Sequence, residues 1–117
     1  MADASSPIRH IDWQDRTAVV TVAGDIDMAR SKAFQAALAG LVDENPQRIV
    51  IDLSGVEYMD SSGVASLVKL HTQTKKIGAS MGLAQVGRRV MSIFEIMRLN
   101  QLFQIYDTLD DALSSDS

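Results

Sequence analysis

The sequence feature that most constrains the fold is a short apolar run near the middle of the chain, Arg48-Ile49-Val50-Ile51-Asp52-Leu53. Its β-branched residues favour a β-strand. The apolar residues do not alternate with polar ones, which indicates a strand that is covered on both faces of its sheet. Such strands lie at the centre of parallel sheets, so the run predicts an α/β fold in which helices connect the strands.

Segments with the apolar period of an amphipathic helix alternate with β-branched segments along the rest of the chain. In the third helix, for example, Val90, Phe94 and Met97 recur on one face, and Asp27 is suited to cap the first helix. Glycine and proline residues mark the ends of the segments. The predicted strands are 8–13, 17–23, 48–53, 80–85 and 103–106, and the predicted helices are 28–42, 62–77, 88–98 and 110–113.

This order, β-β-α-β-α-β-α-β-α, predicts one α/β domain. A short polar turn at residues 14–16 joins the first two strands into an antiparallel hairpin. Each later strand–helix–strand crossover makes its strands parallel. We therefore expect a mixed, mostly parallel sheet with an antiparallel N-terminal edge hairpin and, because the chain is short, helices mainly on one face. The domain is predicted at residues 8–113, with flexible tails at 1–7 and 114–117.

The composition argues against several classes of function. The 117 residues carry a formal net charge of −4 and scattered basic residues, so the chain lacks the basic stripe that nucleic-acid binding needs. It has no cysteine, which excludes disulfides and thiolate metal sites. No apolar run approaches the roughly 20 residues of a membrane-spanning helix, and the polar amino end lacks a signal-peptide core. We therefore expect a cytoplasmic protein without direct membrane insertion.

Three loops leave the sheet where its parallel strands end, at residues 24–27, 54–61 and 85–88. Ligands of open α/β sheets bind outside the carboxyl ends of the strands. If the domain has a functional surface, we expect it at this edge, which we call the rim. The polar residues that these loops bring to the rim are Asp25, Asp27, Asp60, Ser61, Ser62 and, as a further candidate, Arg88.

Catalysis at the rim is not expected. A serine nucleophile needs a base within hydrogen-bond reach, but His71 lies ten residues from Ser61, about 15 Å along one helix, and His10 lies on the edge strand. Two distant histidines without cysteine do not build a transition-metal site. The chain also lacks a glycine-rich loop ending in Lys-Ser or Lys-Thr that would hold nucleotide phosphates. We therefore expect a protein that is not an enzyme and needs no cofactor.

A phosphate could be carried at the start of the second predicted helix. The N-terminus of a helix has unpaired N–H groups and the positive end of the dipole, so a phosphoserine at Ser61 would leave the fold intact. A binding partner would instead meet a dianion, which is costly in an interface without a counter-charge. These residues therefore favour an on/off protein contact. The alternative is that a serine at this position is simply the helix cap.

The segment around these serines resembles the signature of a known family. Residues 48–64 have the sequence RIVIDLSGVEYMDSSGV, which is similar to STAS domains, specifically those of the bacterial anti-sigma-factor antagonists. The turn Gly24-Asp25-Ile26-Asp27 resembles the Gly-Glu-Leu-Asp turn of that family, and Phe94 fits an aromatic residue of its third helix. The resemblance covers residues 8–113 and implies the STAS fold.

The resemblance also implies a function. Family members, which are not enzymes, bind a kinase-type anti-sigma factor while unphosphorylated and thereby free a sigma factor for transcription. That serine kinase phosphorylates the first serine after the aspartate, which here is Ser61, and a PP2C-type phosphatase removes the phosphate. Asp27 corresponds to a residue in the kinase contact, and Asp60 and Ser62 flank the acceptor. We expect the partner-binding residues to be Asp25, Asp27, Asp60, Ser61 and Ser62.

Two segments depart from the family pattern. Asp25 stands where glutamate is common, which is a minor change. The family often has a small residue and glycine after the third helix, whereas residues 97–103 are Met-Arg-Leu-Asn-Gln-Leu-Phe. We expect Asn100 to take the left-handed conformation of that glycine. Two alternative functions stay open: a STAS accessory subunit of an ABC-type membrane transport complex, which would need no phosphorylation, and a domain that binds a nucleotide at the rim.

Overall fold

The computed structural model of the protein describes residues 6–114, and in this part of the chain the elements follow the predicted order. Five strands form one sheet in the order β1-β2-β3-β4-β5. The strands are β1 (Ile8–Gln14), β2 (Thr17–Ala23), β3 (Arg48–Gly55), β4 (Ser80–Ala84) and β5 (Gln104–Tyr106). The helices are α1 (Met28–Asp43), α2 (Ser61–Lys76), α3 (Arg88–Ile96), the 3-10 helix η1 (Leu99–Gln101) and α4 (Leu109–Ser114).

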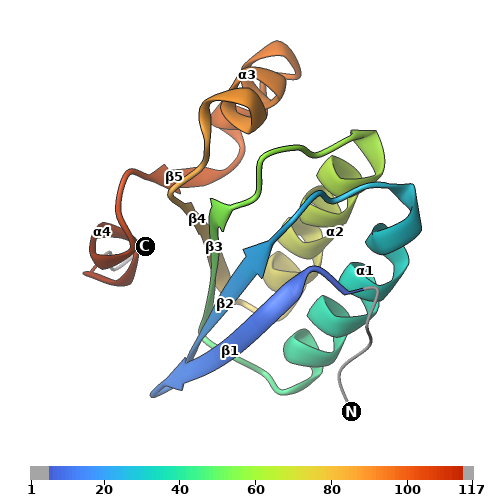
Figure 1. Ribbon diagram of the computed structural model, residues 1–117. Helices are drawn as coiled ribbons and strands as arrows, with labels where there is room; N and C mark the ends of the chain where they lie inside the picture. Colours follow the sequence, from blue (N-terminus) through green and yellow to red (C-terminus); the bar gives the residue numbers. More distant parts are fainter. Residues whose placement is uncertain (1–5, 115–117) are drawn as a thin grey trace.

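The sheet is mixed in the way that the sequence predicts. β1 pairs antiparallel with β2, and the remaining neighbours pair in parallel. α1 and α2 lie side by side on one face of the sheet, and α4 lies on the other (Figure 1). α3 lies beyond the carboxyl end of β4 (Figure 1). The predicted α/β fold with its antiparallel N-terminal edge is confirmed.

β3 is the central strand, and its first six residues are buried. Ile49 and Ile51 belong to the main core, which also includes Phe34 of α1 and Leu67 of α2. Val50 points to the opposite face, where it packs with Ala84 and Ala112 beneath α4. Side chains on both faces of β3 are therefore removed from water, which explains why this segment lacks the alternation of a half-exposed strand.

The segment after α3 differs from the prediction. The helix ends at Ile96, two residues early, and the left-handed residue is Arg98 (φ 60°) instead of Asn100. The N–H of Arg98 donates to the carbonyl oxygen of Glu95 at 3.1 Å, which closes the last turn. Met97, the first residue after the helix, is 48% exposed, although its spacing predicted a place on the buried face.

The predicted tails lie mostly outside the described residues. At the amino end of the described part, Pro7 is buried, and its carbonyl oxygen accepts the N–H of Ala23 at 3.0 Å. The contacts of the sheet therefore begin just before β1. Between residues 6 and 114, none of the helices has both the length and the apolar character needed to cross a membrane.

Candidate functional site

The loops after β2 and β3 are joined at the rim. Ile26 and Met59 form a parallel β-bridge between them, and both side chains are fully buried. The N–H of Ile26 donates to the carbonyl oxygen of Tyr58 at 3.0 Å, and the N–H of Asp60 donates to the carbonyl oxygen of Ile26 at 3.1 Å. These bonds make one continuous surface from two loops that lie far apart in the sequence, where the chain enters α1 and α2 (Figure 1).

Both helices begin at this surface with an aspartate cap. The Asp27 carboxylate accepts the N–H of Arg30 at 3.1 Å, so its predicted role as the cap of α1 is confirmed. The Asp60 carboxylate accepts the N–H groups of Ser62 at 2.9 Å and Gly63 at 3.2 Å. The alternative that a serine caps the second helix is therefore wrong. Asp60 supplies the accepting oxygen, and α2 already begins at Ser61.

Asp60 also connects α2 to α1. Its Oδ2 accepts the N–H of Met28 at 3.2 Å, and its Oδ1 accepts the hydroxyl of Ser62 at 2.5 Å. The hydrogen bond from the Ser62 hydroxyl is the main cause that lowers the pKa of Asp60 below its ordinary value of 3.8. Burial raises this pKa, and the hydrogen bonds from the backbone N–H groups lower it further. The carboxylate is consequently ionised at neutral pH.

The two serines at this helix start have different surroundings. Ser61 is exposed, and its hydroxyl makes no hydrogen bond with any of residues 6–114. Ser62 is half-buried, and its hydroxyl is held by Asp60. Ser61 is also the first residue of α2, next to the N–H groups at the helix N-terminus. Of the two hydroxyls, that of Ser61 is the accessible one.

Asp25 and Arg88 lie at the rim without joining this network. Asp25 is exposed, and its carbonyl oxygen accepts a bond of 3.4 Å from the guanidinium of Arg30. Arg88 lines a shallow cavity of about 380 Å³ together with Ser54 and Glu57, beside the loop between β3 and α2. The structure therefore brings Asp60 and Ser62 into contact and leaves Asp25 and Arg88 at the margins of the rim.

Two exposed apolar residues of the rim were not predicted as functional from the sequence. Met28 is 78% exposed at the start of α1, and Tyr58 is 46% exposed in the loop before Met59. Both flank the bridge that joins the loops. Their place at the carboxyl ends of parallel strands is a weak signal, because Ile26 and Met59 occupy the same segments and are fully buried.

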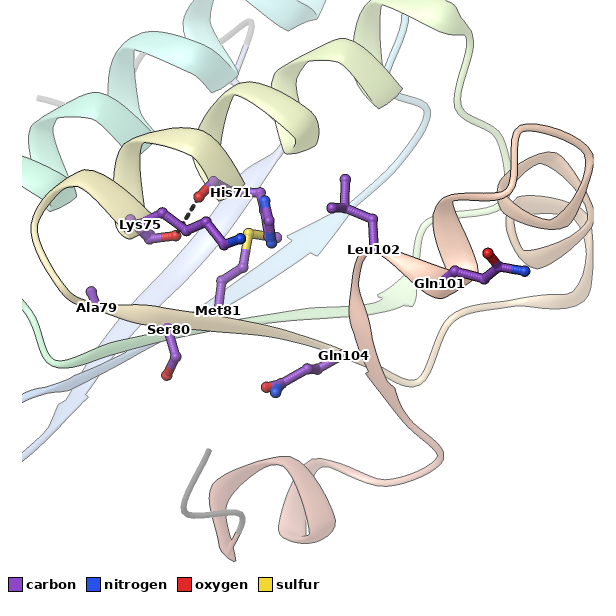
Figure 2. A pocket seen from close by; sticks show the side chains of 9 residues that line it. His71, Lys75, Ala79, Ser80, Met81, Gln101, Leu102 and Gln104 are labelled. Atoms are coloured by element: carbon purple, nitrogen blue, oxygen red, sulfur yellow. Dashed lines mark hydrogen bonds between the residues drawn. The ribbon is translucent and has the colours of Figure 1, made fainter.

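A second cavity of about 380 Å³ lies away from the rim, between α2 and the segment that leads into β5 (Figure 2). His71 and Lys75 of α2 and Leu102 line it, and the His71 ring packs edge-on against Phe103 at a centroid distance of 6.1 Å. Burial lowers the pKa of His71, and the charge of Lys75 lowers it further. Among residues 6–114, no group of three histidine or acidic residues could hold a metal ion.

Comparison with known proteins identifies relatives of the whole domain. Residues 10–112 match the STAS domain family. The chain is 34% identical over 99 residues to the anti-sigma-F factor antagonist RsfB of Mycobacterium tuberculosis, covering 83% of this chain and 79% of RsfB. It is 30% identical over 86 residues to the anti-sigma-B factor antagonist of Bacillus subtilis, covering 74% and 78%. The crystal structure of an anti-sigma factor antagonist from Mycobacterium paratuberculosis has the same fold, with a TM-score of 0.84, 31% identity and 97% of both chains covered.

Proposed function

The chain belongs to the STAS domain family, and from this we propose that it is an anti-sigma-factor antagonist switched by phosphorylation of Ser61. Unphosphorylated, it binds a kinase-type anti-sigma factor through the rim and releases the sigma factor that this kinase holds. Relatives at 34% and 30% identity are antagonists of anti-sigma-F and anti-sigma-B factors, which supports this activity. We expect it to act in the cytoplasm as a binding protein and not as an enzyme.

The observation that carries the proposal is the position of Ser61. Its hydroxyl is exposed at the first residue of α2, beside the joined rim loops, and no hydrogen bond from residues 6–114 has to break before it is modified. A phosphate there adds about −1.5 to −2 charge at pH 7. The helix N-terminus favours such a charge by up to about 2 kcal/mol. The fold would therefore survive the modification.

The binding partner would not tolerate the same change. The rim already carries four acidic side chains, those of the exposed Asp25 and Glu57 and of the half-buried Asp27 and Asp60, whereas the basic Arg30 and Arg88 lie at its margins. A partner surface that accepts the neutral hydroxyl of Ser61 would have to bury a dianion without a dedicated counter-charge, which costs several kcal/mol. Each 1.4 kcal/mol is tenfold in affinity, so a loss of about a thousandfold is within reach.

In the proposed cycle, the anti-sigma factor is also the kinase. The γ-phosphoryl group of ATP passes to Oγ of Ser61, the hydroxyl proton leaves, and ADP is released. The modified protein dissociates and the anti-sigma factor can bind its sigma factor again. A PP2C-type phosphatase hydrolyses the phosphate and restores the antagonist.

The proposal is tested by incubating the protein with an anti-sigma kinase from its own organism and ATP. Mass spectrometry should find one phosphate, on Ser61, and none on the Ser61→Ala variant. Ser61→Asp should abolish kinase binding while the thermal midpoint stays nearly constant. A phosphate on another residue would refute the site. Co-purification of the unmodified protein with a membrane transport ATPase would favour the accessory-subunit function instead.

A further inference from the structure

Ser61 and Ser62 are adjacent at the start of α2 and carry the same hydroxyl group, but in the part of the chain that the structure describes only the hydroxyl of Ser62 makes a hydrogen bond with another side chain. The hydroxyl of Ser62 donates to Oδ1 of Asp60 at 2.5 Å, and the same oxygen accepts the N–H groups of Ser62 and Gly63. Oδ2 of Asp60 accepts the N–H of Met28 at 3.2 Å. Both oxygens of this carboxylate are therefore fixed, whereas the hydroxyl of Ser61 bonds to nothing within residues 6–114.

A phosphate on Ser62 would be incompatible with this arrangement. In the transfer, the bond from Oγ to the γ-phosphorus of ATP forms, the bond from that phosphorus to its bridging oxygen breaks, the hydroxyl proton leaves, and ADP is released. The Ser62 side chain would then have no proton to donate, and a dianion would stand against the carboxylate of Asp60. Asp60 would have to turn away, which removes the cap of α2 and the bond to Met28.

The contact of Asp60 with the Ser62 hydroxyl could also be read as activation, since a kinase uses an aspartate to accept the proton of its substrate hydroxyl. The bonding around Asp60 argues against this. Three backbone N–H groups and the hydroxyl itself stabilise its charge and lower its pKa, so the carboxylate is a weak base. Its contact with Ser62 therefore restrains the hydroxyl and does not activate it.

From these contacts we infer that Asp60 is a positioning residue that directs phosphorylation to Ser61 by holding the hydroxyl of Ser62. The inference rests on the proposed function, which takes Ser61 as the acceptor. Modification of Ser61 leaves the bonds of Asp60 in place, whereas modification of Ser62 destroys them. The selection between two neighbouring serines is thus built into the substrate and does not depend on the kinase alone.

Phosphoserine introduced during translation tests the inference without a kinase. We expect the Ser61→phosphoserine protein to unfold within about 2 °C of the unmodified protein. The Ser62→phosphoserine protein should lose about 5 °C or more, the shift that follows the loss of a helix cap in a domain of this size. Equal midpoints for the two phosphoproteins would overturn the inference.

The matched background is Asp60→Gly. Glycine is among the residues that a helix cap position tolerates best, and it brings no charge. The cost of the phosphate is measured relative to Asp60→Gly itself, which has already lost the bonds of Asp60 to Ser62 and Met28. In this background, Ser62→phosphoserine should cost no more than about 2 °C, because the repelling carboxylate is gone. If the phosphate at Ser62 costs as much without Asp60 as with it, Asp60 is merely structural and the inference fails. If the Ser62→phosphoserine protein does not fold at all, the inference still requires that the protein with both Asp60→Gly and Ser62→phosphoserine folds.

Failure of the proposed function gives a different result. If the kinase and ATP leave no phosphate on Ser61 of the wild-type protein, the proposed function is refuted, while the stability comparison still decides the role of Asp60. If Ser61 is modified, the Ser61→Ala protein should take up no phosphate, and the Ser61→Ala/Asp60→Gly protein should take it up on Ser62. Uptake on Ser62 in the Ser61→Ala protein with Asp60 intact would overturn the inference.

Discussion

Gly63 packs directly on Ile26 at the point where α2 meets the joined rim loops. A Cβ added at Gly63 would stand 2.8 Å from Cγ2 of Ile26 and 2.9 Å from its carbonyl oxygen. It would also stand 2.6 Å from Cγ of Met59. Carbon atoms do not approach one another this closely without displacement, and two of these three neighbours are fully buried side chains. Position 63 therefore has to be glycine for the rim to keep its shape.

The first prediction is that Gly63→Ala destabilises the fold by about 1–3 kcal/mol, the usual cost of overpacking a closed core. The matched control is Gly40→Ala in α1, where a Cβ meets no atom within 4 Å. That change should stabilise by about 0.5–1 kcal/mol, because alanine replaces glycine inside a helix. Urea unfolding of the two variants measures both effects. Similar stabilities would show that the loops can move away from α2 at little cost.

The second prediction concerns the pH dependence of stability through Asp60. Its pKa in the folded protein is lowered below the ordinary value of 3.8. Its contribution to stability is therefore present above that value and is lost as the pH falls through the lower, folded value. Asp60→Asn keeps a good helix cap but removes the charge. The thermal midpoints of wild type and variant should differ at neutral pH and converge in strong acid. A constant difference from about pH 7 to about pH 2 would contradict this assignment.

Much of the fold could be predicted because its signals are local. The apolar run of β3 and the Asp27 cap depend on a few neighbouring residues, and both were located correctly. The end of α3 could not be predicted in this way. Phe103 packs edge-on against Phe94 at a centroid distance of 5.5 Å, a contact that requires the chain to turn soon after Ile96. Such a tertiary contact outweighs the helical spacing that extended to Met97.

The site was predictable in its location but not in its bonding. The order of strands brought the loops of Asp27 and Asp60 to one edge without any knowledge of side-chain positions. Aspartate and serine cap helices about equally well, so the sequence did not identify which residue near Ser61 was the cap. The bonds from Asp60 to Ser62 and to Met28 depend on how two distant segments meet, which only the tertiary structure contains.

The third prediction is that Arg48 anchors β5 and α4 to the sheet. Its buried guanidinium donates to the Ser80 hydroxyl at 2.9 Å and to the carbonyl oxygen of Ala112 at 3.3 Å, and it lies 5.7 Å from the centroid of the Tyr106 ring. Arg48→Met should cost about 2 kcal/mol or more, since buried acceptors lose a charged donor. Arg88→Met, at an exposed arginine, should stay within about 0.5 kcal/mol.

Denaturant unfolding measures the cost of Arg48→Met, and amide hydrogen exchange locates it. The exchange of β5 and α4 should accelerate more than that of α1, because the lost bonds hold the carboxyl-terminal elements. Exchange that accelerates equally throughout the domain would mean that Arg48 contributes to global stability and has no special role for these two elements.

The fourth prediction concerns His71, whose ring lines the cavity of Figure 2. Burial, with the charge of Lys75, lowers its pKa below the ordinary value of 6.5. Between the two values the unfolded chain binds more protons, so stability falls as the pH falls through this range. The His71→Gln variant should therefore lose less folding stability than the wild type over this pH range. In Lys75→Met, the pKa of His71 should rise slightly towards its ordinary value, as an NMR titration of the ring would measure. An unchanged or lower value would exclude Lys75 as a cause.

The last prediction is that Met28 and Tyr58 anchor the binding partner, and it depends on the proposed function. Both are large apolar side chains exposed on the rim beside Ser61. Interfaces gain much of their affinity from a few such residues surrounded by polar ones, and the acidic residues of the rim provide that surrounding. Each substitution by alanine should weaken kinase binding by about tenfold or more, which corresponds to about 1.4 kcal/mol.

The control for these variants is Ile77→Ala. Ile77 is 37% exposed just beyond the carboxyl-terminal end of α2, at the opposite end of the helix from Ser61. Its substitution should leave the affinity unchanged, and the thermal midpoints of Met28→Ala and Tyr58→Ala should stay near that of the wild type because exposed side chains contribute little to the core. Titration calorimetry with the kinase provides the affinities. If Ser61→Asp abolishes binding but neither rim variant weakens it, Met28 and Tyr58 do not anchor the partner and the prediction is wrong.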